Sequence, residues 1–168
     1  MKSLLIFLIL SSATLLVEAQ SAVYKHTFSI EALGVGRYGS MGYRRLLSED
    51  SIAQYQLRTG LAVMRLYNYE NKLNPDFSIP LMVEAVIGKG RNRLELSLGQ
   101  IFTSYSRFEI SEFKEGRVNE LSLATGFGYR FVSSDRWEYR LSSYLIWDDY
   151  DEIHPWIGVS CGYRFGKL

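Results

Sequence analysis

Two histidines and two serines in polar segments are the side chains of this sequence that could take part in acid–base or nucleophilic chemistry. His154 ends an acidic segment, D-D-Y-D-E-I-H, over residues 148–154. A serine-type hydrolytic site needs a histidine within hydrogen-bond reach of a nucleophilic serine and an acid. Ser104 and Ser106 lie in a separate polar segment, and nothing in their spacing couples them to His154. We therefore predict that these are solvent-exposed loop residues and that the protein is not an enzyme.

The acidic segment is also the best candidate for a metal site. Hard cations such as Ca²⁺ bind clustered carboxylate oxygens, but the spacing of the acids in residues 148–152 matches no calcium-loop pattern. The glycines of G-V-G at 34–36 and G-F-G at 126–128 do not open a helix, as nucleotide-binding glycines do. We predict no metal and no cofactor. The formal net charge of +1 removes the electrostatic argument for nucleic-acid binding.

The elements that carry these residues are strands, because most of the chain alternates between apolar and polar residues. In N-R-L-E-L-S-L, residues 92–98, every second residue from Leu94 is a leucine. No helical period is found after the N-terminus. The single Cys161 excludes an intrachain disulfide. Strands are predicted over residues 27–34, 38–47, 54–66, 77–88, 92–102, 120–132, 136–147 and 155–165.

The connections between these strands are of two kinds. Short turns are predicted at 48–54, 88–92 and 133–135, and longer loops at 67–76, 103–117 and 148–155. Turns at one end of a barrel and loops at the other are typical of outer-membrane barrels. Residues 34–37 are either a very short connection or a glycine kink within one strand. The first reading gives eight strands, and the second gives seven.

The N-terminus has the features of a secretory signal peptide. Lys2 is followed by an apolar run, and Val17-Glu18-Ala19 fits the small-x-small rule for cleavage. We predict a signal peptide over residues 1–19 and one exported domain over residues 20–168. No later apolar run approaches the ~20 residues that a membrane-spanning helix needs.

Two kinds of barrel share this alternation, and they differ in which face is dry. A soluble barrel of the lipocalin kind holds its apolar residues inside around a ligand, whereas a membrane barrel turns them toward lipid. The polar faces here carry many Gly, Ser and Ala beside arginine rather than lysine. Arginine pairs with buried carboxylates better than lysine does, which favours a polar interior. The predicted interior polar network comprises Glu31, Arg44, Arg58, Glu84, Glu95, Arg130, Glu138, Arg140 and Arg164.

Aromatic residues are abundant, with twelve Tyr, nine Phe and three Trp. Several stand on apolar faces close to the predicted strand ends. Aromatic girdles occupy such positions in membrane barrels, at the level of the lipid headgroups. The predicted interface aromatics are Tyr129, Phe131, Trp137, Tyr139, Tyr163 and Phe165 near one end, and Trp147 near the other.

The C-terminal stretch I-G-V-S-C-G-Y-R-F, residues 157–165, resembles the closing strand of small bacterial outer-membrane barrels, which commonly end in an aromatic residue. Here three residues follow Phe165. The strand–turn–strand pattern over residues 77–102 resembles small proteins of the same group. The resemblance implies an all-β fold, an antiparallel up-and-down transmembrane β-barrel of about eight strands. It also implies an outer-membrane location and a monomer, with membrane lipid, the barrel-assembly machinery and a loop-binding molecule as partners.

The resemblance implies no chemistry, and a structural or loop-mediated interaction role is the main prediction. Two alternatives stay open. One is a soluble periplasmic barrel that binds an apolar ligand. The other is a lipid A-modifying enzyme, since some barrels of this size are lipid A acylases or deacylases. His154 is followed by Pro155 and Trp156, without the serine two positions on that the deacylase-type motif has.

Overall fold

The computed structural model describes residues 23–36, 38–67, 72–88, 90–109, 114–133, 136–148 and 152–167. The predicted signal segment, residues 1–19, lies outside the described residues. No helix among the described residues is long and apolar enough to cross a membrane. The strands are β1 (Tyr24–Leu33), β2 (Gly39–Glu49), β3 (Ala53–Tyr67), β4 (Leu73–Ile87), β5 (Asn92–Glu109), β6 (Lys114–Val132), β7 (Trp137–Trp147) and β8 (Ile153–Lys167).

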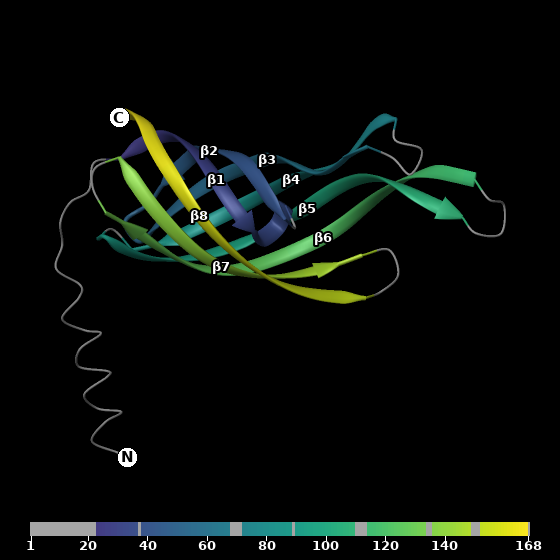
Figure 1. Cartoon of the computed structure of the whole chain (residues 1–168). Helices are drawn as coiled ribbons and strands as arrows, with labels where there is room; N and C mark the ends of the chain where they lie inside the picture. Colours follow the sequence, from purple (N-terminus) through teal and green to yellow (C-terminus); the bar gives the residue numbers. More distant parts are fainter. Residues whose placement is uncertain are drawn as a thin grey trace, which may run out of the picture.

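These strands form one closed antiparallel barrel in which each strand pairs with its neighbours in the chain (Figure 1). The barrel closes between β1 and β8, where Ile30 pairs with Cys161. On its other side Ile30 pairs with Met41 of β2. Closure leaves no unpaired edge in the body of the barrel, so the backbone hydrogen bonds there are satisfied between strands. The predicted up-and-down barrel of eight strands is confirmed.

Residues 34–36 form a short 3₁₀ turn, labelled η1, between β1 and β2. Leu33 and Gly34 have φ values of 59° and 75°, in the left-handed region that reverses the chain. Residues 34–36 therefore belong to a connection between two strands rather than to a kink within one strand. Val35 at its tip is buried, and η1 contacts strands on both sides of the barrel, so the turn folds into the lumen.

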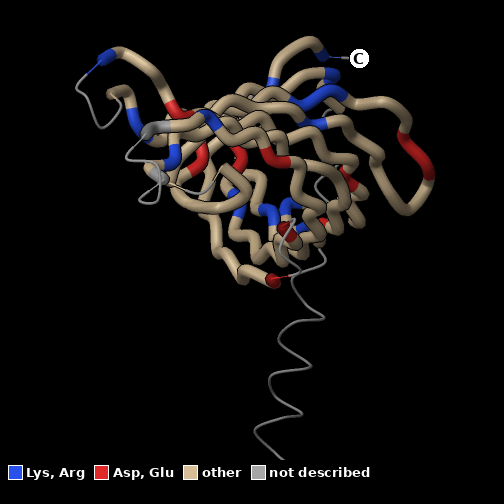
Figure 2. Tube along the Cα trace, turned by 90° about the vertical axis from the view of Figure 1, so that its right-hand side faces the viewer, with Lys and Arg blue, Asp and Glu red and all other residues tan. Residues whose placement is uncertain are grey.

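The two ends of the barrel differ (Figure 1). At the short-turn end lie both ends of the described chain and the three turns that follow β2, β4 and β6. At the opposite end, which we call the hairpin end, the β5–β6 hairpin projects well beyond the barrel body. Figure 2 turns the hairpin end toward the viewer and shows basic and acidic positions along the trace.

The longer loops predicted from sequence are shorter in the structure because the strands extend into them. The segment 103–117, predicted as a loop, is mostly β-ladder: β5 continues to Glu109, β6 begins at Lys114, and Ser106 pairs with Arg117. Similarly, β4 begins at Leu73 and β8 at Ile153. The prediction was wrong here because it equated polar with irregular. A hairpin in water satisfies its backbone through its partner strand and needs no apolar face.

The barrel is inverted relative to a soluble protein. Leu96 exposes 50% of its surface on the outside, whereas its neighbour Glu95 exposes 1% on the inside. The same alternation runs along β4, where Leu81 and Val83 are exposed and Met82 and Glu84 are buried. Leu94, Leu96 and Leu98 therefore cover the outer wall. The interior holds most of the buried charge.

Candidate functional site: the charged interior

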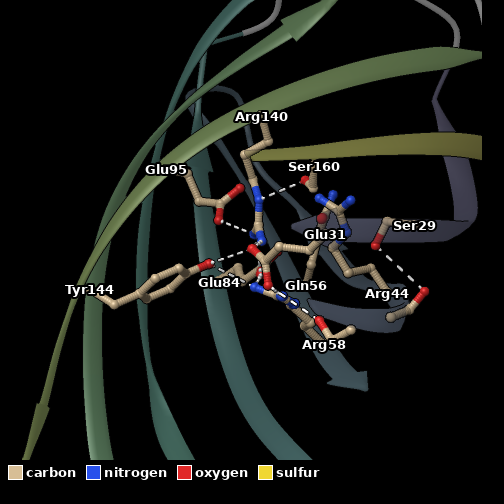
Figure 3. A network of polar contacts seen from close by, with 12 residues as sticks. Ser29, Glu31, Arg44, Gln56, Arg58, Glu84, Glu95, Arg140, Tyr144 and Ser160 are labelled. Carbon is tan, nitrogen blue, oxygen red and sulfur yellow. Dashed lines mark hydrogen bonds and ion pairs between the residues drawn. The ribbon is translucent and has the colours of Figure 1, made fainter. Parts of the chain in front are cut away.

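Strand alternation places one charged side chain after another inside the barrel, where they meet across the lumen (Figure 3). Each comes from a different strand, so only closure of the barrel brings them together. All of them are almost fully buried. The central charged network consists of Glu31 (β1), Arg58 (β3), Glu84 (β4), Glu95 (β5), Arg130 (β6) and Arg140 (β7).

Arg140 is the hub of this network. Its Nη2 lies 2.7 Å from a carboxylate oxygen of Glu31. Its Nη1 lies 3.0 Å from Glu84 and 2.7 Å from Glu95. Its Nε donates to the Ser160 hydroxyl at 3.3 Å. One guanidinium group therefore joins three carboxylates that are far apart in the sequence.

The other two arginines complete the network. Arg130 bonds to Glu95, and its Nη2 lies 3.1 Å from Glu84. Arg58 Nη2 lies 2.6 Å from Glu31, and its Nη1 donates to the Tyr144 hydroxyl at 2.7 Å. Three guanidinium groups thus face three carboxylates, and the charges of this layer balance. This charge balance matters because a buried ion loses its hydration energy, and without a partner of opposite charge no interaction offsets that loss.

A second charged group, which we call the mouth cluster, lies toward the short-turn end. Arg44 Nη2 lies 2.8 Å from a Glu138 oxygen, and the other Glu138 oxygen lies 3.7 Å from Arg130. Arg164 stacks over the Tyr24 ring at 4.9 Å. Arg93 donates to the Gly90 carbonyl and to Gln54, both at 2.9 Å. The mouth cluster consists of Arg44, Arg93, Glu138 and Arg164, all of which are buried.

The sequence analysis missed three members of the interior. Arg93 stands two positions before Glu95 and so shares its face, a signal that strand alternation alone could have supplied. Gln56 accepts a hydrogen bond from Arg130 at 2.9 Å. Tyr144 alternates on the same face of β7 as Glu138 and Arg140, and its hydroxyl contacts both Arg58 and Glu31. The nine predicted network residues all lie in the central network or the mouth cluster.

An apolar layer closes the lumen above the central network, on the side of the hairpin end. It forms around Val35, which the η1 turn inserts into the barrel. The Tyr144 ring belongs to this layer while its hydroxyl reaches the charges below. The layer consists of Val35, Met82, Ile101, Ala124, Tyr144 and Ile146, with Trp156 packed against it. Side chains therefore occupy the lumen from the network to the η1 turn.

The predicted interface aromatics lie on the outer wall. Phe131 pairs with Tyr139, and Trp137 packs edge-on against Tyr163 with ring centroids 5.3 Å apart. Exposed Arg136 donates to the Tyr163 hydroxyl at 2.7 Å, and this bond raises the pKa of Arg136. Six of the seven residues surround the short-turn end: Tyr129, Phe131, Trp137, Tyr139, Tyr163 and Phe165. Trp147 ends β7 at the hairpin end, opposite Ile153.

The side chains that could do chemistry are not brought together. His154 Nε2 lies 2.9 Å from Asp148 and 3.7 Å from Glu152, all within the β7–β8 connection. Ser104 and Ser106 are buried side chains of β5, so the prediction that they are exposed loop residues was wrong. Ser104 donates to Asn119, and the Ser106 hydroxyl accepts from Asn74. Within the described part of the chain, the His154 ring therefore meets carboxylates and neither of these serines.

A polar cluster that the sequence analysis did not foresee ties two hairpins together at the hairpin end. Arg65 of β3 bonds to Asp76 of β4, and Asp76 accepts the Ser106 backbone N–H at 2.7 Å. Arg117 of β6 donates to Ser104 and to the Pro75 carbonyl. Its guanidinium group also lies over the Phe77 ring. These bonds hold the start of the β5–β6 hairpin against the β3–β4 hairpin.

Comparisons with known proteins identify the fold. No family model matches the sequence, and no curated protein resembles it significantly. The N-terminal β-barrel domain of Pseudomonas aeruginosa OprF superposes with a TM-score of 0.59 at 15% identity, covering 84% of this chain and 98% of that one. Ail, the attachment invasion locus protein of Yersinia pestis, gives 0.55 at 14% identity, covering 83% and 93%.

The structure of Yersinia pestis outer membrane protein Ail in a phospholipid bilayer nanodisc gives a TM-score of 0.53 at 18% identity. It covers 85% of this chain and 100% of that one. At these identities the likeness concerns the fold alone. The chain therefore has the closed eight-stranded antiparallel fold of small outer-membrane barrels.

Proposed function

We propose that this protein is a monomeric outer-membrane β-barrel with a structural or loop-mediated interaction role and no catalytic activity. Residues 1–19 act as its export signal, and residues 20–168 form the membrane domain inserted by the barrel-assembly machinery. The observation that carries the proposal is the inversion of the barrel, with leucines outside and paired charges inside. Lipid is the environment in which such a surface is stable.

The inversion also separates this proposal from a soluble barrel that carries an apolar ligand. In such a barrel the apolar ligand occupies an apolar interior. Here the interior contains the central charged network and is closed above it by Val35 and Tyr144. In water, the outer wall would expose apolar residues over every strand, far beyond the few hundred Å² that soluble monomers tolerate.

The interface aromatics indicate how the barrel is oriented in the membrane, and the filled lumen indicates whether it conducts solutes. The six aromatics around the short-turn end would lie at the periplasmic interface, and Trp147 at the outer one. The nine predicted network residues would hold the wall together from within. Because paired side chains fill the lumen of an eight-stranded barrel, we infer that the protein is not a pore.

The hairpin end favours an interaction role. The pairing of β6 with β7 begins at Leu123, and the pairing of β4 with β5 ends at Ser104. Among the described residues, the projecting part of β6 before Leu123 therefore pairs with β5 and has no strand paired to its other edge. A free strand edge offers unpaired N–H and C=O groups, to which an extended peptide can add as a further strand.

A matched pair of substitutions tests the membrane location. Leu96→Arg places a charge on the outer wall, at a cost of about 2–4 kcal/mol near the middle of the bilayer. Leu73→Arg makes the same change at the hairpin end, where β4 begins. We expect the unsubstituted protein and Leu73→Arg to fractionate with outer membranes and to run differently on gels before and after boiling in detergent. Leu96→Arg should lose both properties. Equal assembly of the two variants, or a soluble protein, would contradict the proposal.

A further inference from the structure

A groove of about 670 Å³ crosses the outer wall of the barrel over β4, β5 and β6. It lies on the outside, where Leu96 is exposed, whereas the preceding Glu95 is buried in the lumen. Tyr55 lies at the end of the groove nearer the short turns, and Gln100 lies at the end nearer the hairpin end. No charged residue of the described chain lines the groove. Its main lining side chains are Val83, Ala85, Leu96, Leu98, Leu123 and Thr125.

The recess exists because two small side chains flank β5 in a wall of larger ones. Ala85 of β4 pairs with Leu96, and Thr125 of β6 pairs with Leu98. The Thr125 hydroxyl donates to the Ser97 carbonyl at 3.2 Å, so it is satisfied within the wall. The recess therefore presents mainly apolar atoms, which lose dispersion contacts unless a flexible apolar group fills the space.

Gln100 is a polar side chain of the groove that the wall leaves unsatisfied. It is exposed on the outside, where it pairs with Leu81 of β4 and Leu123 of β6. Its amide has no hydrogen-bond partner within the described part of the chain. An amide carries two N–H donors and one carbonyl acceptor, and placing it in apolar surroundings without a hydrogen bond is unfavourable. The molecule that fills the groove therefore has to offer a hydrogen-bonding atom at the Gln100 end.

The position of Gln100 indicates which part of a lipid lies beside it. Leu123, the partner of Gln100 on β6, pairs in turn with Trp147, the interface aromatic of the hairpin end. Interface aromatics lie at the level of the lipid headgroups. Gln100 is therefore close to the depth at which ester groups join the acyl chains of a lipid to its headgroup. From there the groove continues along the apolar part of the wall toward Tyr55.

We propose that this groove, which we call the wall groove, binds one ester-linked acyl chain of a membrane phospholipid. The proposal rests on the outer-membrane location proposed above. The hydrocarbon chain fills the recess between Ala85 and Thr125, and the Gln100 amide donates a hydrogen bond to the ester carbonyl. An acyl chain is narrow and apolar with an acceptor at one end, which is the distribution of polarity that the groove has. A second copy of the barrel would offer a convex wall, which fills a recess poorly.

The test compares two phospholipids that differ only in how their chains are linked. The protein is folded in a detergent without ester groups and incubated with equal amounts of phosphatidylglycerol and its ether-linked analogue, which lacks the carbonyl oxygens. Native mass spectrometry then measures the lipid that each protein molecule retains. We expect a single retained lipid and an about fivefold preference for the ester-linked form, which corresponds to one ordinary hydrogen bond.

Variants locate the lipid in the wall groove. Gln100→Leu should lose the preference for the ester. Ala85→Leu fills the recess and should reduce retention of both lipids, whereas Ala32→Leu makes the same change on the outer wall of β1, across the barrel from β5, and should not. Equal retention of the two lipids, or the same preference in Gln100→Leu, would overturn the proposal. Displacement of the phospholipid by an equal amount of lipid A, or a dimer that Gln100→Leu dissociates, would overturn it as well.

The gel mobility of each variant before and after boiling separates this proposal from the one on which it rests. A barrel that forms and shows no preference for the ester contradicts the wall groove alone. A soluble protein contradicts the outer-membrane location itself. If Ala85→Leu does not assemble, Gln100→Leu decides the outcome, because a leucine at this position matches its neighbours on the outer wall.

Discussion

At the scale of single residues, Arg140 shows why the interior is both stable and vulnerable. Its guanidinium group contacts Glu31, Glu84 and Glu95 within 3.0 Å. Burying these groups removes their hydration energy. The ion pairs offset this loss only when every arginine and every glutamate has its partner. Loss of one arginine leaves three carboxylates with two guanidinium partners inside a wall that admits little water.

We therefore expect Arg140→Met to lower the free energy of unfolding by about 3–5 kcal/mol. Arg65→Met is the matched control, because the Arg65–Asp76 pair at the hairpin end is partly exposed and should be worth at most about 1 kcal/mol. Urea unfolding of both variants, folded in the same detergent, measures the difference. Similar losses for the two variants would mean that the central network does not stabilise the barrel.

His154 is the residue on which an enzymatic role depends. Its ring contacts Asp148 and Glu152, whereas Ser104 and Ser106 bond to other residues. We expect His154→Ala to leave the lipid A profile of expressing cells unchanged, as measured by mass spectrometry. Cells carrying the unsubstituted protein and cells carrying an empty vector are the controls. A profile that depends on His154 would restore the lipid A-modifying alternative.

At the scale of elements, the β5–β6 hairpin is the part of the chain whose role differs from that of the barrel wall. Its base is fastened by Asp76, which accepts the Ser106 N–H, and by Arg117, which donates to the Pro75 carbonyl. Beyond this base, the β6 edge pairs with no described strand before Leu123. The barrel body closes without the projecting part of this hairpin, because β6 pairs with β7 and β4 with β5 closer to the short-turn end.

Shortening this hairpin should therefore remove binding without removing the barrel. Residues 107–116 can be replaced by Asn-Gly, a two-residue turn that suits the paired positions Ser106 and Arg117. We expect the shortened protein to retain its heat-dependent gel mobility. Peptides selected from a random library for binding to the full-length protein should bind the shortened protein at least tenfold more weakly. Undiminished binding would show that the hairpin is not the interaction surface.

At the scale of the whole molecule, the lumen is filled from the mouth cluster to the η1 turn. Paired charges occupy its lower part, and Val35 with its apolar neighbours occupies the upper part. A conducting path would need these side chains to separate, which would leave buried charges without partners. The side chains that stabilise the barrel wall from within therefore also close the lumen.

We expect liposomes that contain the folded protein to show no swelling in isotonic small sugars above that of protein-free liposomes. A general diffusion porin provides the positive control for the assay. Removing the Val35 side chain by Val35→Gly tests the apolar layer, and it should not open the barrel because the central network lies below. Swelling with the unsubstituted protein would contradict the closed lumen.

Sequence alone determined the strands and their faces, because strand alternation is local. Leu96 and Glu95 point to opposite sides of any strand that contains both. The choice between lipid outside and ligand inside was also within reach, since arginines and small residues on the polar faces indicate a narrow charged interior. The ends of the hairpins could not be predicted from the sequence, because polar residues occur both in loops and in paired strands that are exposed to water. Segment 103–117 is an example.

Only the tertiary structure decided which charges meet. Arg140 and Glu31 are 109 positions apart, and their contact depends on the closure of β8 against β1. A shift of two residues in strand register would keep every side chain on the same side of the barrel wall. It would nevertheless bring each arginine next to a different carboxylate. The insertion of Val35 into the lumen has the same origin. It follows from barrel closure, which no local pattern encodes.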